Sequence, residues 1–199
     1  MSINTTDLLQ LLNSWLVPEQ FKDYCHNGIQ VSNSGRECLH LASAVTASKA
    51  AIDAAAEVNA DVLLVHHGLF WQGDEFSING LNYHRVKALM QNDIALLAYH
   101  LPLDEHLIHG NNVLLGRELG ISSEQQHNLG LMQPSLGRYA RQKFLADDLF
   151  GQLTNIMQRT PQHFAFGPAE IDCLAWCTGA AQDGILEAYK AGAKAYISG

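Results

Sequence analysis

Apolar residues recur at helical spacing in four segments of the chain. Residues 5–16 (TTDLLQLLNSWL) carry leucines on one helical face, with Thr5, Thr6 or Asp7 available as the N-cap. The other segments that predict helices are 48–60, which begins at the capping residue Ser48, 84–92 and 146–158.

Between these segments lie predicted strands at 39–47, 61–68 and 93–104, of which 61–68 is apolar on both faces before its histidines and 93–104 is apolar until His100. Runs that are apolar at every position are typical of strands covered by helices on both faces. The order strand, helix, strand, helix, strand predicts an α/β fold built from mainly parallel sheets.

The strand and helix pattern of 44–68 returns at 176–199, with Thr46 aligned to Thr178. Any two βαβ units share part of this pattern, so duplication and chance both remain open. Duplication predicts two α/β/α sandwiches, the second incomplete at Gly199. The predicted parts are a first α/β lobe at 1–120 that carries the metal ligands, a connecting subdomain at 121–172, and the start of a second lobe at 173–199.

The composition is that of a globular protein, with 47% hydrophobic and 16% charged residues among 199. The formal net charge of −8 comes without a basic block, which argues against a nucleic-acid partner. The N-terminal segment has neither the basic start of a signal peptide nor a membrane span, so we expect a cytoplasmic protein with no membrane partner.

Two of the predicted strands end in histidine. His66 and His67 close the run 61–68, and His100 closes the next one, four residues before Asp104. Ligands of parallel sheets bind beyond the carboxyl ends of the strands, so we expect these side chains to meet. Three imidazoles and a carboxylate suit zinc, iron, manganese or nickel.

The number of ions remains open. Neighbouring strand residues point to opposite faces, so His66 and His67 can bind one ion only if the chain leaves the strand, which Gly68 allows. Alternatively, each binds its own ion of a pair roughly 3.5–4 Å apart, which fits a regular strand better and makes Asp104 a terminal or bridging ligand. Incidental surface histidines are the third alternative.

Residues near these ligands have simpler interpretations. His106 is expected to support a ligand without contacting the metal, and Asn111 and Asn112 to cap the following helix. Cys173 and Cys177 would lie about 13 Å apart along a strand, too far for one ion. With Cys25 and Cys38 they are expected to be buried free thiols, and no catalytic residue is assigned.

Five motifs in this order, DYCHNGIQV, AVTAS, ADVLLVHHGLFW, YHLPLDEH followed by GNN, and AWCTG, resemble the GTP cyclohydrolase 1 type 2 family, or Nif-three-like proteins, in its short bacterial form. The resemblance implies a duplicated α/β/α fold, a toroidal homohexamer and two divalent metal ions. It matches His66 and His67 to ligands of different ions, Asp104 to a ligand of the first, and His100 to a site histidine. Family members continue to a His-His-x-x-Glu segment, which this sequence does not contain.

The resemblance also implies an activity, hydrolysis of the guanine ring of GTP by a metal-bound hydroxide with release of formate. A small-molecule substrate of the nucleotide class and a metal-dependent hydrolase are therefore expected. The alternative is a non-catalytic protein that binds metal or a regulatory partner. No general base is evident in the sequence apart from the ligands, which favours the alternative.

Overall fold

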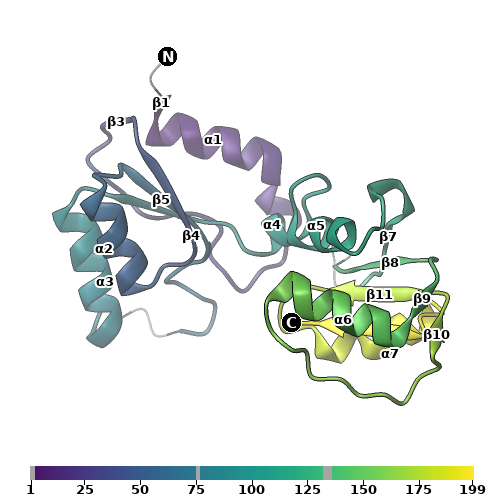
Figure 1. Ribbon diagram of the computed structural model, residues 1–199. Coiled ribbons are helices and arrows are strands. Elements are labelled where there is room, and N and C mark those ends of the chain that lie inside the picture. Colours follow the sequence, from purple (N-terminus) through teal and green to yellow (C-terminus); the bar gives the residue numbers. More distant parts are fainter. Residues whose placement is uncertain (1–2, 75–76, 132–135) are drawn as a thin grey trace. The chain divides into compact units, whose positions relative to one another are not determined.

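A computed structural model describes residues 3–74, 77–131 and 136–199. The chain divides into two compact units, Met1–Leu103 and Asp104–Gly199, which are described separately (Figure 1). The division into parts at 1–120, 121–172 and 173–199 stays a prediction.

The first unit is built on a four-stranded sheet of order β2-β6-β5-β4. Its strands are β2 (Gly28–Val31), β4 (Leu41–Thr46), β5 (Val62–His67) and β6 (Ala95–Ala98). β5 pairs in parallel with both β4 and β6, and β2 closes the far edge antiparallel to β6. A two-stranded pair, β1 (Ile3–Asn4) with β3 (Glu37–Cys38), stands apart from this sheet.

Helices cover both faces of the first sheet. The helices of the first unit are α1 (Thr5–Leu16), the short η1 (Pro18–Gln20), α2 (Lys49–Glu57) and α3 (Gly80–Gln91), and α4 (Leu101–Glu105) follows β6. Leu63 and Val65 of β5 pack in one cluster with residues of α2 and α3, whereas Val62 and Leu64 pack with residues of α1. This alternation of buried side chains explains why β5 is apolar at every position from Val62 to Val65.

The second unit has a four-stranded sheet of order β12-β11-β8-β7. Its strands are β7 (His127–Asn128), β8 (Arg138–Ala140), β11 (Leu174–Cys177) and β12 (Ala195–Ser198), beside a separate pair, β9 (Phe144–Leu145) and β10 (Glu170–Ile171). Its helices are α5 (Asn111–Glu118), η2 (Ser123–Gln125), α6 (Ala146–Met157), η3 (Gln182–Gly184) and α7 (Ile185–Lys190). Leu174 and Trp176 pack with α5 and α6, and Ala175 packs with Ala188 of α7.

The α/β class is confirmed in both units. β4-α2-β5 and β11-α7-β12 are each a helix joining two adjacent parallel strands, as the sequence repeat predicts. The first sheet is mainly parallel. In the second, one pairing is parallel and two are antiparallel, because β7, β8 and β11 run in alternating directions.

Several predicted boundaries need correction. The predicted helix at 5–16 forms, but Asn4 is its N-cap rather than Thr5, Thr6 or Asp7: Asn4 is extended, and its side chain accepts a hydrogen bond from the Asp7 amide. Ser48 caps α2 as expected. The predicted strand 93–104 is strand only at Ala95–Ala98. The chain then turns into α4, whose first turn tolerates Pro102.

Two further findings concern the whole described chain. All four cysteines are free thiols, three of them buried and Cys38 half-buried. Within the described residues, no helix has the length and apolar character needed to span a membrane.

Candidate metal centre

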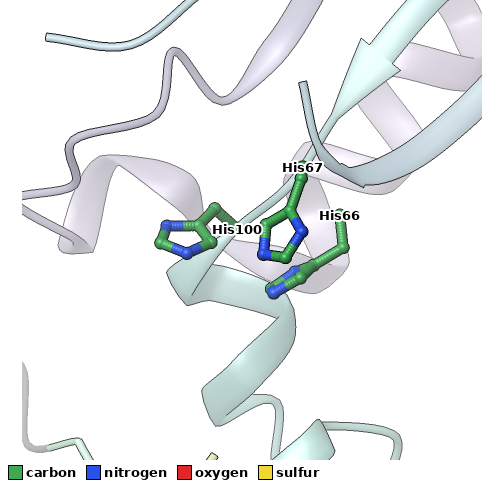
Figure 2. Close-up of side chains that lie close together, drawn as sticks. All are labelled: His66, His67 and His100. Carbon is green, nitrogen blue, oxygen red and sulfur yellow. The ribbon is translucent and has the colours of Figure 1, made fainter. Parts of the chain in front are cut away.

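Three imidazoles from two neighbouring strands meet at one edge of the first sheet. The ladder between β5 and β6 pairs Val65 with Ala98, and the Tyr99 amide donates to the Val65 carbonyl at 3.0 Å, so both strands end at the same edge. One ligand atom from each of His66, His67 and His100 lies within 4.8 Å of the other two (Figure 2). The predicted meeting of these three side chains is therefore found in the structure.

The adjacent rings of His66 and His67 do not diverge. Their centroids are 4.4 Å apart, and that of His100 is 4.9 Å from His66 and 5.7 Å from His67. A regular pleat would part the two side chains to opposite faces, whereas here the rings of the last two residues of β5 lie close together. Nitrogens bound to one ion lie within about 4 Å of each other, so the separations found here, up to 4.8 Å, are slightly larger than those around one ion.

A hydrogen bond at Nδ1 holds each ring from a different side. The partner of His66 is the Tyr99 carbonyl oxygen at 3.1 Å, on the β6 side. The partner of His67 is Thr46 Oγ1 at 3.2 Å, on β4, and that of His100 is Asp23 Oδ1 at 2.8 Å. Metal-binding histidines characteristically have the second ring nitrogen hydrogen-bonded in this way, which leaves Nε2 as the ligand atom.

Asp23 was not identified from the sequence, although it lies in the quoted segment DYCHNGIQV. Its side chain is only 2% exposed. Burial by itself would raise the pKa of this carboxyl. Hydrogen bonds from the His100 ring, the Cys25 amide, the Asn27 side chain and the Leu101 amide outweigh burial and lower the pKa to about 2. An aspartate just before an Asn-Gly turn was the available signal, but many surface loops share it.

Gln30 fixes the loop that follows His67. Its Oε1 atom accepts from the Leu69 amide at 2.7 Å, and its Nε2 atom donates to the His26 carbonyl at 2.9 Å. A Cβ atom on Gly68 would collide with this carboxamide, coming within 2.6 Å of its carbon. The absence of a side chain at residue 68 therefore lets the Gln30 carboxamide approach this loop closely.

Trp71 borders the cluster. Its ring lies 5.0 Å from that of His100, edge-on at 80°, and 6.0 Å from that of His67. The indole donates to the Gly68 carbonyl at 3.3 Å, and the residue is half-buried. The Trp71 ring therefore lies beside the histidines, and both Trp71 and Phe70 also pack against the core of the first unit.

The remaining predicted ligand, Asp104, belongs to the second unit, where it is buried. Its Oδ1 atom accepts from Asn111 Nδ2 at 2.8 Å and from Thr178 Oγ1 at 3.2 Å. Thr178 is the repeat counterpart of Thr46, which contacts His67. Thr46 ends β4 and Thr178 follows β11, and each of them hydrogen-bonds one predicted ligand.

Asn112 is not an N-cap, contrary to the sequence interpretation: Gly110 is the N-cap, and Asn111 and Asn112 are the first residues of α5. Asn112 is fully buried. Its Nδ2 atom donates to Glu105 Oε1 at 2.6 Å, and its Oδ1 atom accepts from the Thr178 amide at 2.8 Å. The side chain thus joins α4 to the end of β11, a role that local sequence does not reveal.

Two more groups of the second unit flank Asp104. Glu105 forms a buried ion pair with Arg138 at 2.8 Å, and burial raises the pKa of its carboxyl despite that partner. The Nδ1 atom of His106 accepts from the His109 amide at 3.0 Å, and its ring stacks on that of His109. Burial, followed by the nearby His109, lowers the pKa of His106.

Comparison with known proteins decides the family. The model of the family described as Duf34/NIF3 (NGG1p interacting factor 3) matches residues 3–199. The chain belongs to the Duf34/NIF3 family.

Curated members of the Duf34/NIF3 family are similar over nearly the whole chain. It is 40% identical to a GTP cyclohydrolase 1 type 2 homolog of Vibrio cholerae, covering 99% of this chain and 79% of that protein. A protein of the same name from Pseudomonas aeruginosa is 41% identical, covering 100% of this chain and 79% of its own length. The resemblance inferred from the motifs is thereby confirmed.

A solved structure has the same fold. The structural-genomics protein ybgI, described as of unknown function, is 33% identical and superposes with a TM-score of 0.88, covering 99% of this chain and 78% of that chain. Duf34/NIF3 membership and this superposition agree with the α/β architecture described above.

Proposed function

We propose that this protein binds divalent metal at the edge of its first sheet, with His66, His67 and His100 as ligands. The observation that carries the proposal is the convergence of three imidazoles whose Nδ1 atoms are each hydrogen-bonded to a separate group. Imidazole nitrogen suits zinc, iron and nickel, so the donor set fits the expected ions. The names of the curated relatives are in keeping with a nucleotide-related small molecule as the partner.

The finer proposal is a centre of two divalent ions. It rests on the family resemblance, which matches His66 and His67 to different ions and adds Asp104 as a carboxylate ligand. His106, just after Asp104 in the sequence, is proposed to support a ligand without contacting the metal. A carboxylate widens the range of suitable ions to manganese. Assembly into a homohexamer is proposed on the same basis, and sedimentation velocity of the metal-loaded protein tests it.

The proposed activity is hydrolysis of a purine nucleotide. A bound divalent ion would supply Lewis acidity and lower the pKa of water to near neutrality. The protein would position this chemistry: Asp23 and Thr46 orient two of the rings, and Trp71 borders the cluster. Asp23 stays ionised at neutral pH because its pKa is about 2.

A non-catalytic role in binding metal or a regulatory partner is the second candidate. The state of Asp23 favours it, since a carboxylate with a pKa of about 2 and four hydrogen-bond donors is a weak general base. This candidate requires bound metal without turnover.

Elemental analysis and turnover separate these proposals. We expect the wild type to retain metal after dialysis, and His66→Ala, His67→Ala and His100→Ala to retain much less. His84→Ala is the matched control, because His84 is exposed on α3. Equal metal content in all five proteins would overturn the metal centre. Formate release from GTP by the loaded wild type supports hydrolysis, whereas bound metal without turnover of a nucleotide panel favours the binding role.

A further inference from the structure

The segment from Asp23 to Gln30 hydrogen-bonds both His100 and the loop that follows His67. We propose that Asp23 is a positioning residue that holds His100 as its Nδ1–H tautomer and thereby directs Nε2 toward the metal. This inference rests on the proposed metal centre and adds to it a residue that selects the ligand atom.

The carboxylate of Asp23 is surrounded by donors. Its Oδ1 atom accepts from the Cys25 amide at 3.0 Å and from His100 Nδ1 at 2.8 Å. Its Oδ2 atom accepts from Asn27 Nδ2 at 2.9 Å and from the Leu101 amide at 2.8 Å. Three of these donors have fixed roles, the amides of Cys25 and Leu101 and the Nδ2 atom of Asn27, and an ionised carboxylate, which is acceptor-only, satisfies all three. His100 therefore has to present a protonated Nδ1.

The backbone of His100 is held by the same segment. Asn27 Oδ1 accepts from the His100 amide at 2.8 Å, while its Nδ2 atom donates to Asp23. These two bonds fix the orientation of the Asn27 amide, since reversing it would break both. The ring and the main chain of His100 are thus anchored together, and only a small freedom of rotation remains.

The segment is itself tied to the loop after His67. The His26 amide donates to the Phe70 carbonyl at 3.3 Å, and the Gln72 amide donates to the Tyr24 carbonyl at 2.6 Å, around a bridge between Cys25 and Trp71. Gln30 adds its bond to the Leu69 amide. One segment therefore fixes Asp23 relative to both strand ends, which a positioning role requires.

An asparagine at this position is a sharp test because it keeps the shape and changes one acceptor into a donor. If its nitrogen replaced Oδ1, it would face His100 Nδ1, which could then pair only as an unprotonated acceptor. If its nitrogen replaced Oδ2, it would face the Leu101 amide and Asn27 Nδ2, both donors. The first arrangement leaves one donor, the Cys25 amide, without an acceptor. The second leaves two donors without one, the Leu101 amide and Asn27 Nδ2.

The experiment compares Asp23→Asn with Asp61→Asn. Asp61 is the matched control: it too is a buried carboxylate that accepts from backbone amides, those of Leu39 and His40, but it lies at the opposite end of β5. All proteins are first shown to be folded by circular dichroism at the working temperature. Histidine tautomers are then read in metal-free protein by long-range ¹H–¹⁵N NMR, and Zn²⁺ affinity is measured by competition with a chelator.

We expect the wild type and Asp61→Asn to show His100 as the Nδ1–H tautomer and to bind Zn²⁺ equally well. Asp23→Asn should shift His100 toward the Nε2–H form and lower the affinity about 10–100-fold. An unchanged tautomer in Asp23→Asn would overturn the inference, whatever the affinity. If instead wild type and His66→Ala bound Zn²⁺ equally, the proposed metal centre would fall, and the tautomers of the metal-free protein would still decide the role of Asp23.

Discussion

The Nδ1 atom of His100 lies 2.8 Å from the Oδ1 atom of Asp23, across 77 positions of the chain. The contact joins the segment before β2 to the residues that follow β6. Trp71 stands between the two segments, because residue 71 bridges to Cys25 while its ring contacts that of His100. Binding of a metal ion at the histidines should therefore change the fluorescence of this indole.

Fluorescence of Trp71 is expected to report metal binding. Cu²⁺ and Co²⁺ quench nearby indoles, and the Trp71 ring lies 5.0 Å from that of His100 and 6.0 Å from that of His67. Titration of the wild type with Co²⁺ should quench emission saturably. Trp15→Phe should keep this response, since Trp15 is 59% exposed on α1. Quenching that survives in Trp71→Phe would place the binding elsewhere.

Asn112→Asp is expected to destabilise the second unit by roughly 3 kcal/mol at neutral pH, because it places a second buried carboxylate 2.6 Å from Glu105 Oε1. The loss should shrink in acid, as the new carboxyl takes up a proton. Urea unfolding at pH 7 and pH 5 measures both effects. Asn155→Asp, the same change at an exposed position of α6, should stay within about 0.5 kcal/mol. Similar losses in the two variants would contradict this.

Gly110→Ala is expected to destabilise the second unit by about 2–4 kcal/mol, since a Cβ there would collide with the His106 carbonyl and lie 2.8 Å from that of Asp104. Backbone atoms cannot move aside as a side chain can. Gly151→Ala is the control: residue 151 lies within α6 with open space around it, so alanine should stabilise by up to about 1 kcal/mol. Thermal melts of the two variants check the contrast, and a stable Gly110→Ala protein would refute it.

Asp61 should make the first unit sensitive to acid. Burial raises the pKa of this carboxyl, but bonds from the His40 and Leu39 amides and the Arg36 guanidinium at 2.7 Å lower it below its usual 3.8. A carboxyl whose pKa is lowered in the folded protein stabilises the fold above pH 3.8. This stabilisation is lost as the pH falls through the pKa that the carboxyl has in the folded protein. Asp61→Asn should therefore be less stable than wild type at pH 7, with the gap narrowing toward pH 3 in urea unfolding. A gap of constant size would contradict this.

Local sequence determined the elements of this protein because its signals act over a few residues. The Ser48 cap, the leucine spacing of 5–16 and the apolar run before His66 each fix a helix or strand through neighbours in the chain. Parallel strands with helical crossovers then bring their carboxyl ends to one edge, so the approach of His100 to His66 and His67 followed from topology alone. The motifs added the Duf34/NIF3 family, which the comparison confirmed.

The tertiary structure decided what the local patterns leave open. It placed the rings of His66 and His67, the last two residues of β5, 4.4 Å apart, where a regular pleat would part them. It also gave Asp23 and Asn112 their roles, since each satisfies donors more than 60 positions away, and nothing beside them in the sequence marks those partners. Buried polar groups must find partners wherever the fold brings them, and that depends on the whole chain.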